Sequence, residues 1–330
     1  MPKKQITIPV FLPNAGCPNR CVFCDQAKSS GAGPPPSGAE MEAIIEKRLA
    51  TRPPSVERTE IAFFGGNFTG LPPETQEMYL SIAHRHLSAR RVDGIRLSTR
   101  PDCIDTPGVS LLKRFGVGIV ELGVQSFSDR VLDAARRGHD AAASLRAIEL
   151  LGRNGIGFVL QLMAGLPESG PGEELESARI AADAGPRGVR IFPAVVLEGT
   201  PLADMYRAGS YRPLSLEEGV ERCKTLVGLF MGRGIPVIRT GLHPLKPGEL
   251  PSVLAGPYHP SFGYLVKSRL RRDELENTIA RRIAEDGPGP VVIALPRECR
   301  GEYLGKGGEN IRYLEEKFKP VSIAWERVKA

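Results

Sequence analysis

The residues best suited to chemistry in this chain are three cysteines that fall within eight positions. They are Cys17, Cys21 and Cys24, in the stretch Cys-Pro-Asn-Arg-Cys-Val-Phe-Cys. Closely spaced thiolates bind iron or zinc through short bonds of fixed geometry, so the stretch predicts a metal centre. Three local ligands leave one metal position without a nearby protein ligand, and an open position is where a reactant can bind.

Zinc and an iron–sulfur cluster are the two candidates for this centre. Structural zinc sites usually close with four ligands, and their cysteines often come as two separated pairs. No second Cys/His pair stands at zinc spacing, because His84 and His86 lie two residues apart in an expected helix and would face different sides of it. A cluster with three cysteines and one open iron fits the pattern better.

The composition is that of an ordinary globular chain, with 330 residues, 41% of them hydrophobic and 25% charged. The other three cysteines are scattered, which argues against the disulfide framework of a small secreted protein. The apolar run 6–12 is too short for a signal peptide, and no run approaches the length of a membrane span. We therefore expect a cytoplasmic protein with no membrane contact. The net charge of +6 permits a nucleic-acid partner without requiring one.

The elements that must position the cysteines repeat one pattern from residue 5 to about 240. A short β-rich run, a loop with Gly or Pro and a helix-length amphipathic segment follow one another, which predicts an α/β fold with a parallel sheet. Six or seven such units are fewer than the eight of a closed barrel, so we expect a partial (β/α)6 TIM-like barrel. The expected strands are Gln5–Leu12, Glu60–Phe64, Gly94–Thr99, Gly118–Val124, Gly157–Met163, Gly188–Ala194 and Pro236–Thr240.

The expected helices end in several cases at a glycine just before the next strand, as at Gly155 and Gly234. In folds of this kind, the loops after the strands carry the site, and the cysteines follow the first strand. The expected helices are Ala39–Ala50, Pro73–Ser88, Val109–Phe115, Asp129–Ala135, Ala141–Arg153, Gly172–Ala184 and Leu216–Arg233.

Beyond residue 240 the pattern changes, and we place a domain boundary between 1–265 and 266–330. The segment 243–260 is rich in Pro and Gly and is expected to be a loop or linker. The elements expected after it are a charged helix, a strand, a helix and a last strand, at Tyr264–Asp286, Pro290–Leu295, Glu309–Phe318 and Val321–Arg327.

The stretch 303–313 resembles the core of a KH domain, in which two helices flank a G-x-x-G loop. Here that loop is Gly305, Lys306, Gly307 and Gly308. By this resemblance the tail is a small α+β KH-like domain. Its glycines would let the phosphate backbone of single-stranded nucleic acid approach, while exposed N–H groups and Lys306 meet the negative charge. A simple helix–turn–helix junction also uses glycine and is the alternative.

The cysteine loop, with Phe23 before its last cysteine, resembles that of the radical S-adenosylmethionine (SAM) superfamily. Further motifs follow in the order that the family shows, and the resemblance covers about residues 5 to 240. The series is similar to the branch that holds the Elongator catalytic subunit and oxygen-independent coproporphyrinogen oxidase. These motifs are Phe64-Gly-Gly66, Glu121-Leu-Gly-Val-Gln-Ser126, Arg137-Gly-His139, Gly165-Leu-Pro167 and Gly199-Thr-Pro-Leu202.

The resemblance implies an enzyme in which Cys17, Cys21 and Cys24 each bind one iron of a [4Fe-4S] cluster. The fourth iron would bind SAM, and an electron from a flavodoxin- or ferredoxin-like donor would cleave it. The resulting 5′-deoxyadenosyl radical would abstract hydrogen from a substrate. By matching position, the cofactor contacts would be Phe11, Phe23, Gly65, Gly66, Ser98, Gln125, Arg137 and Gln161.

Two of these positions depart from the family pattern, because Ser98 and Gln161 stand where a carboxylate is often found. A neutral Ser98 would hold the ammonium group of SAM less strongly. The nearby Glu121 either faces the cofactor or pairs with an arginine, and the sequence leaves both open.

The sequence is compatible with three functions. The first is a radical enzyme that acts on RNA, with transfer RNA (tRNA) the favoured substrate and the tail as its handle. The second is a radical enzyme for a small molecule, such as a porphyrin-like compound or a cofactor precursor. The third is an RNA-binding protein with a structural cluster. The Elongator catalytic subunit also has an acetyltransferase domain, for which we expect no room in this chain. The oligomeric state is not predicted.

The first testable prediction concerns the metal. Protein purified without oxygen should be brown and hold about four iron atoms per chain, as a cubane cluster requires. Replacing Cys17, Cys21 and Cys24 by alanine should remove both the colour and the iron in an elemental assay. A colourless protein with one bound zinc would exclude both enzyme functions.

Overall fold

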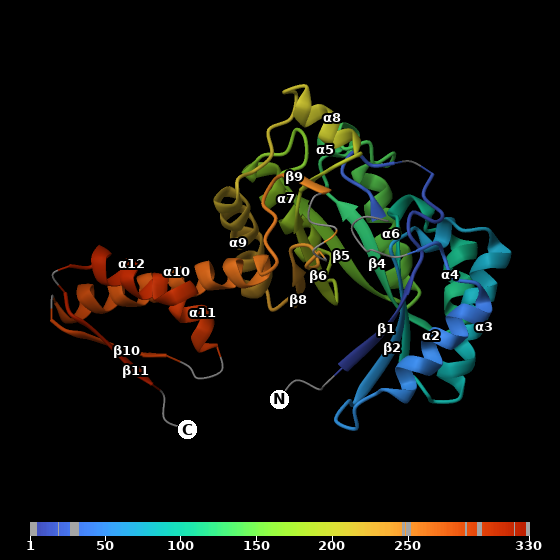
Figure 1. The fold of residues 1–330 in the computed structure, drawn as a ribbon, viewed down its shortest axis with the longest axis horizontal. Helices are drawn as coiled ribbons and strands as arrows, with labels where there is room; N and C mark the ends of the chain where they lie inside the picture. The colour runs from blue at the N-terminus through green and yellow to red at the C-terminus, as the bar shows by residue number, and fades with distance from the viewer. Residues whose placement is uncertain are drawn as a thin grey trace.

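The computed structural model describes residues 5–18, 20–26, 33–245, 248, 252–287, 289–295, 299–319 and 321–327. Its main feature is a parallel sheet of seven strands that curls into a partial barrel (Figure 1), which confirms the expected α/β architecture with one strand more than a (β/α)6 unit. In sheet order the strands are β1 (Gln5–Phe11), β2 (Arg58–Phe64), β3 (Gly94–Thr99), β4 (Val117–Gln125), β5 (Gly157–Ala164), β6 (Gly188–Pro193) and β8 (Val237–Thr240).

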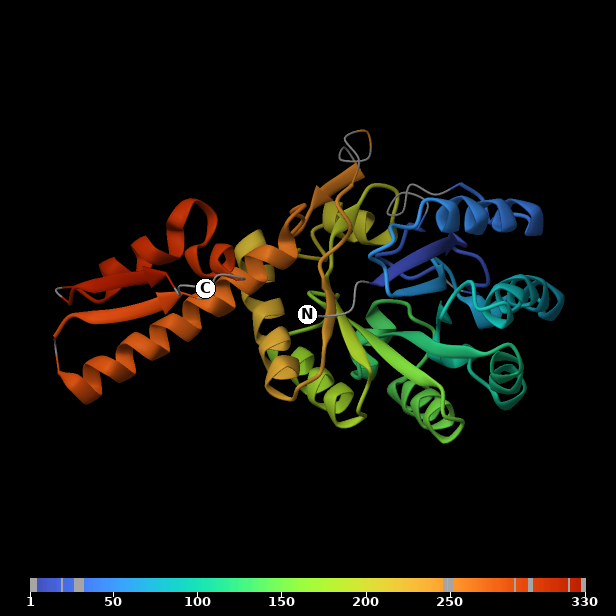
Figure 2. The same cartoon turned by 90° about the horizontal axis from the view of Figure 1, so that it is seen from below.

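Helices follow the strands and cover the outer side of the curled sheet, as the view from below shows (Figure 2). Four of them begin at a side-chain cap of the kind that favours helix starts, namely Ser37, Asp105, Asp140 and Ser215. The helices are α2 (Gly38–Ala50), α3 (Pro73–Ser88), α4 (Thr106–Arg114), α5 (Asp129–Ala134), α6 (Ala141–Arg153), α7 (Pro171–Asp183) and α9 (Leu216–Gly232).

The two faces of the sheet differ in chemistry. Alternate residues such as Ile8, Val10 and Ile61 are fully buried against the helices, where they form the main apolar core. The residues between them face the inside of the barrel, and several are charged. Arg96 pairs with Glu60 at 3.3 Å and with Glu121 at 2.7 Å. The inside of the barrel is therefore polar.

Three short elements were not expected from the sequence. Strands β7 (Val196–Leu197) and β9 (Val253–Ala255) form an antiparallel pair, and helix α8 (Pro201–Arg207) follows β7. The strand β9 lies in the segment that was expected to be a loop. Strands of two or three residues carry too little periodicity to be detected in a sequence. In the described part of the chain, no helix has the combination of length and apolar character that crossing a membrane requires.

The tail contains helix α10 (Phe262–Asp286), strand β10 (Val291–Leu295), helix α11 (Arg300–Leu304), helix α12 (Glu309–Lys317) and strand β11 (Ile323–Arg327). The strands β10 and β11 pair in parallel, and Leu275, Ile279, Ile293 and Leu314 are among the residues of a separate apolar core. The elements α10, β10, α12 and β11 match the four that were expected, and the additional short helix α11 is one of the two helices that flank the G-x-x-G loop.

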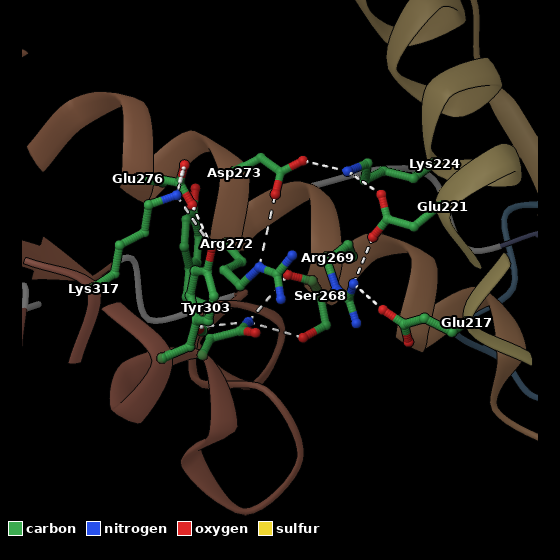
Figure 3. Close-up of polar contacts among 12 residues, drawn as sticks. Glu217, Glu221, Lys224, Ser268, Arg269, Arg272, Asp273, Glu276, Tyr303 and Lys317 are labelled. Carbon is green, nitrogen blue, oxygen red and sulfur yellow. Dashed lines mark hydrogen bonds and ion pairs between the residues drawn. The ribbon is translucent and has the colours of Figure 1, made fainter. Parts of the chain in front are cut away.

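Helix α10 joins the tail to the barrel, and its ion pairs to α9 are visible in Figure 3. Arg269 contacts Glu217 and Glu221, and Lys224 lies 2.6 Å from Asp273. Near the same point, Asn310 of α12 donates to the carbonyl and hydroxyl oxygens of Ser268. The boundary that we predict at 265–266 thus falls inside one continuous helix, which fixes the tail beside the barrel.

Candidate metal centre and cofactor site

The three clustered thiols follow strand β1, at the end of the sheet where the strands terminate. Cys17 is exposed, Cys21 is buried and Cys24 is half-buried. Although part of Cys17 reaches the surface, the loss of solvation among the surrounding loop atoms and then the neighbouring Cys21 raise its pKa. The same causes, with Cys17 added, raise the pKa of Cys24 to about 12. Three thiols in such an environment become thiolates together when cationic metal binds them.

Two arginines supply positive charge on the buried side of the thiols. Arg137 donates from Nη1 to Cys21 Sγ at 2.9 Å, and Arg100 donates to the carbonyl oxygen of Arg137. Asp102 holds Arg100 through two bonds of 2.9 Å. Within the described chain, Arg137 Nε and Arg100 Nη1 are buried without a hydrogen-bond partner. Spare donors beside a thiol sulfur suit a group with net negative charge, so these residues fit a thiolate-bound iron–sulfur cluster.

The first half of the cysteine loop is held by Asn67, which follows the glycine pair at the end of β2. Asn67 is fully buried, its N–H donates to the Ala15 carbonyl at 2.8 Å, and its side-chain amide donates to the Gly16 carbonyl at 2.7 Å. Its side-chain oxygen accepts bonds from Thr99 and from the N–H of Arg100. One amide side chain therefore ties the loop to the residues beyond β3.

The second half of the loop is held at Val22 by two backbone bonds. The Val22 N–H donates to the Ala135 carbonyl at 3.1 Å, and the Val22 carbonyl accepts from the Leu202 N–H at 2.8 Å. Ala135 precedes the Arg137-Gly-His139 motif, and Leu202 closes the Gly199-Thr-Pro-Leu202 motif. Part of the ordered motif series thus serves to position the cysteine loop.

The two glycines at the end of β2 have different reasons to be glycine. Gly65 has φ +87°, and an added Cβ would meet no atom closer than 3.6 Å, so its backbone angle is what requires glycine. A Cβ on Gly66 would lie 2.4 Å from the Leu12 carbonyl oxygen and 2.7 Å from that of Ala15. Gly66 must therefore be glycine because the backbone of the cysteine loop packs directly against it.

The two glutamines expected near the cofactor do meet. Gln161 donates from Nε2 to Gln125 Oε1 at 3.1 Å. Gln125 is buried and has φ +70°, a conformation that costs a non-glycine residue about 1–3 kcal/mol and that clusters at functional sites. Ser98 is the register partner of Glu121 on the same face of the sheet, and Glu121 pairs with Arg96 and Arg190. Glu121 lies on the inner face, and its ion pairs bear out the arginine alternative.

The two aromatic residues expected at the cofactor lie in different surroundings. Phe11 ends β1, with its ring centroid 6.3 Å from that of Phe64. Phe23 packs on an apolar cluster that includes Val22, Met163 and Leu202, so its ring serves to anchor the loop. The structure gathers the three cysteines, the glycine pair and Arg137 at one end of the sheet, whereas Gly305–Gly308 belong to the tail.

Asn67 and Arg100 are the main site residues that the sequence did not single out. A signal for each was present, because Asn67 directly follows the glycine pair and Arg100 directly follows strand β3, where the site residues of such folds lie. Their hydrogen-bond partners could not be predicted from the sequence, because Gly16 lies 51 positions from Asn67 and Arg137 lies 37 positions from Arg100.

Comparison with known proteins identifies relatives for most of the chain. Residues 11–179 match the family model described as the radical SAM superfamily, and residues 186–272 match that of its C-terminal domain. The uncharacterized protein MJ0486 of Methanocaldococcus jannaschii is 30% identical over 64% of this chain and 68% of its own length. The tRNA uridine(34) acetyltransferase of the same organism is 25% identical over 95% of this chain and 65% of its own length.

Among solved structures, the Elp3 protein of Methanocaldococcus infernus has a TM-score of 0.64 at 20% identity. The match covers 83% of this chain and 64% of that protein. The likeness shows a shared fold. The chain thus spans just under two thirds of the Elp3 structure and of the tRNA uridine(34) acetyltransferase.

The geometry at the glycine pair gives the second prediction. Gly66→Ala should displace the cysteine loop, because a Cβ cannot stand 2.4 Å from a carbonyl oxygen, and bound iron should fall severalfold. Gly65→Ala should lower the free energy of unfolding by about 1–2 kcal/mol, because alanine is strained in a left-handed backbone conformation. This variant should keep most of its iron. Iron content and thermal unfolding would be measured together.

Gly152→Ala is the matched control. Gly152 lies in helix α6 with no atom within 4 Å of an added Cβ, so this change should stabilise the fold by about 0.5–1 kcal/mol without affecting iron. Equal iron loss in the Gly65 and Gly66 variants would contradict the assignment of Gly66 to loop packing.

Proposed function

Since the chain belongs to the radical SAM superfamily of enzymes, we propose that it binds a [4Fe-4S] cluster and SAM and uses them to modify RNA, with tRNA as its substrate. The resemblance drawn from the cysteine loop is confirmed at the level of the superfamily. The substrate is the part that the proposal adds.

The observation that carries the cofactor part is the contact between Arg137 and Cys21, with spare buried donors beside it. Cys17, Cys21 and Cys24 would bind three irons. When bound, the cluster would supply the electron for reductive cleavage of SAM, the chemistry that radical abstraction of hydrogen from the substrate requires. The chain's own part is to hold the thiols, balance their charge and present a polar inner surface.

The polar residues next to the loop would orient SAM. Gln125 and Gln161 offer neutral amide groups, and the strained backbone of Gln125 fixes where its amide lies. Arg137 would balance the charge of the cluster from the buried side, while the exposed Cys17 marks the side from which a flavodoxin- or ferredoxin-like electron donor could approach.

The RNA part of the proposal rests on the G-x-x-G loop of the tail. Lys306 and Gly307 are exposed, Gly307 has φ +60°, and no atom lies within 4 Å of a Cβ added there. The loop therefore presents open backbone and one lysine at the start of helix α12, which suits a phosphate backbone. The name of the relative that covers 95% of this chain, a tRNA uridine(34) acetyltransferase, supports tRNA as the class of RNA.

The region shared with that relative limits the proposal to the radical step and its RNA substrate. Acetyl transfer is not included, because the match covers 65% of the relative's length. A small molecule as substrate is the alternative, and the tRNA-binding experiment described below separates it from RNA.

The third prediction tests SAM cleavage. With the cluster loaded and reduced by dithionite, the protein should convert SAM to 5′-deoxyadenosine and methionine, measured by liquid chromatography. Cys21→Ala should give none, because one iron ligand is removed. Intact cluster without any SAM cleavage under reducing conditions would contradict the cofactor part of the proposal.

The fourth prediction tests RNA binding by the tail. Replacing both Lys306 and Gly307 by aspartate should weaken tRNA binding and lower the slope of log K against log salt by about 0.7 for each phosphate of a single strand that the loop no longer neutralises. Aspartate tolerates the left-handed backbone of Gly307, so the loop should keep its shape.

The control for that experiment is Lys319→Asp, which alters an exposed lysine of the same tail away from the G-x-x-G loop. It should leave both the affinity and the salt slope nearly unchanged. If tRNA binding is absent in the unchanged protein, or equal in both variants, the tail is not an RNA handle and the small-molecule alternative is favoured.

A further inference from the structure

Two arginines stand side by side on the inner face of the barrel, at its open edge. Arg190 of β6 and Arg239 of β8 are direct register partners in the parallel pair, so both side chains leave the sheet on the same side. The adjacent Val189 and Ile191 are fully buried in the core under the helices, which places the arginines on the opposite, inner face. Like charges in this position repel each other.

A β-bulge creates this arrangement. The pairing shifts between Val189 and Arg190, so that Val189 pairs with Val237 while Arg190 pairs with Arg239. The extra residue is Ile238, which would otherwise stand opposite Arg190. Bulges re-aim side chains and are common next to functional sites. Here the bulge brings a second guanidinium to the inner face in place of an apolar side chain.

The charges on the inner face do not balance. Glu121 lies 2.9 Å from Arg190 and is shared with Arg96, and Glu60 is also held by Arg96. Arg239 bonds instead to the Gly241 carbonyl at 3.0 Å and to His243 Nε2 at 2.6 Å. Among the described residues, no carboxylate forms an ion pair with Arg239. Arg58, Arg96 and Arg190 thus pair with the two carboxylates Glu60 and Glu121, and Arg239 pairs with neither of them.

His243 adds a hydrogen-bond donor to the pair. Its Nε2 accepts from Arg239, so the ring proton is on Nδ1, which is available to a ligand. Burial and then the neighbouring Arg239 and Arg190 lower the pKa of His243, which keeps the ring neutral and preserves this tautomer.

The position of the pair connects it to the cofactor residues. The guanidinium carbon of Arg190 lies 5.5 Å from the centroid of the Phe64 ring, and Phe64 directly precedes Gly65 and Gly66. A group bound by Arg190 and Arg239 would therefore lie inside the barrel, near the end of the sheet that carries the expected cofactor residues.

We infer that Arg190, Arg239 and His243 bind an anionic oxygen group of the substrate inside the barrel. The planar, multiple donors of arginine match the oxygens of phosphate or carboxylate, and such an anion removes the repulsion between the two guanidinium groups. On the proposed function, on which the source of the anion rests, the group is a phosphate of the RNA strand next to the modified nucleotide.

The experiment measures thermal unfolding of the full-length protein in sodium phosphate, sodium acetate and sodium chloride at equal ionic strength and pH. Phosphate should raise the unfolding midpoint above that in chloride. Arg239→Gln should weaken the phosphate effect by about tenfold in concentration, as expected when one charge-assisted hydrogen bond is removed. In chloride the same variant should unfold at an equal or higher temperature, because the repulsion with Arg190 is relieved.

Arg52→Gln is the control, because Arg52 is exposed between α2 and β2, outside the barrel interior. This variant should have the same three unfolding midpoints and the same phosphate effect as the unchanged protein. A structural role for Arg239 predicts the opposite pattern, with a lower midpoint in chloride and an intact phosphate effect, and would overturn the inference. Equal midpoints in phosphate and chloride for the unchanged protein would also overturn it.

The effects of phosphate and acetate on the unfolding midpoint are compared to identify the source of the anion. Because phosphate also stabilises folded proteins by exclusion from their surface, only the part of each effect that Arg239→Gln removes is counted. A phosphate effect of this kind that exceeds the acetate effect supports an RNA phosphate, whereas equal effects support the same site with a carboxylated small molecule. Because inorganic anions require neither RNA nor SAM turnover, failure of this site is distinguishable from failure of the proposed function, which the tRNA and SAM measurements report.

Discussion

The rest of the site depends on how one irregular loop is held. The loop carries three thiols that repel one another when ionised, and its own regular structure is slight. Its position is set from outside by the buried amide of Asn67 and by the backbone bonds at Val22. Gly66 completes the fit, because any side chain there would occupy the space of the loop backbone. A cluster bound to such a loop is positioned by packing as much as by its ligands.

The inside of the barrel is built for polar ligands. A closed barrel fills its interior with branched apolar side chains, whereas this incomplete one presents Glu60, Arg96, Glu121 and Arg190. Three irregularities in strand pairing lie in this sheet. One lies between Ile95 and Arg96, one lies between Leu122 and Gln125 and accompanies the strained backbone of Gln125, and one lies at Ile238. Each lies beside a polar side chain of the inner face.

The tail and the barrel are joined by one helix that contributes to the apolar cores of both. Helix α10 contributes Phe262 and Val266 to the barrel core and Leu275 and Ile279 to the tail core. Ion pairs to α9 hold it at the crossing between the two (Figure 3). Because the helix is continuous, RNA held at the G-x-x-G loop would approach the barrel from a fixed direction. On the proposed function, the polar inner face and the tail would be two parts of one path for RNA.

The strand–helix alternation could be predicted from the amino-acid sequence, as could most element boundaries to within a few residues, the cysteine loop and the family. These features are local, since they depend on period, caps and glycine at turns. Three contacts could not be predicted and become visible only in the fold: Asn67 bonds to the cysteine loop, Gly66 lies against Ala15, and Arg239 lies beside Arg190. The partners in these contacts are far apart in the chain, and the last depends on a one-residue bulge. No local pattern encodes a contact whose other half is set by how the strands pair.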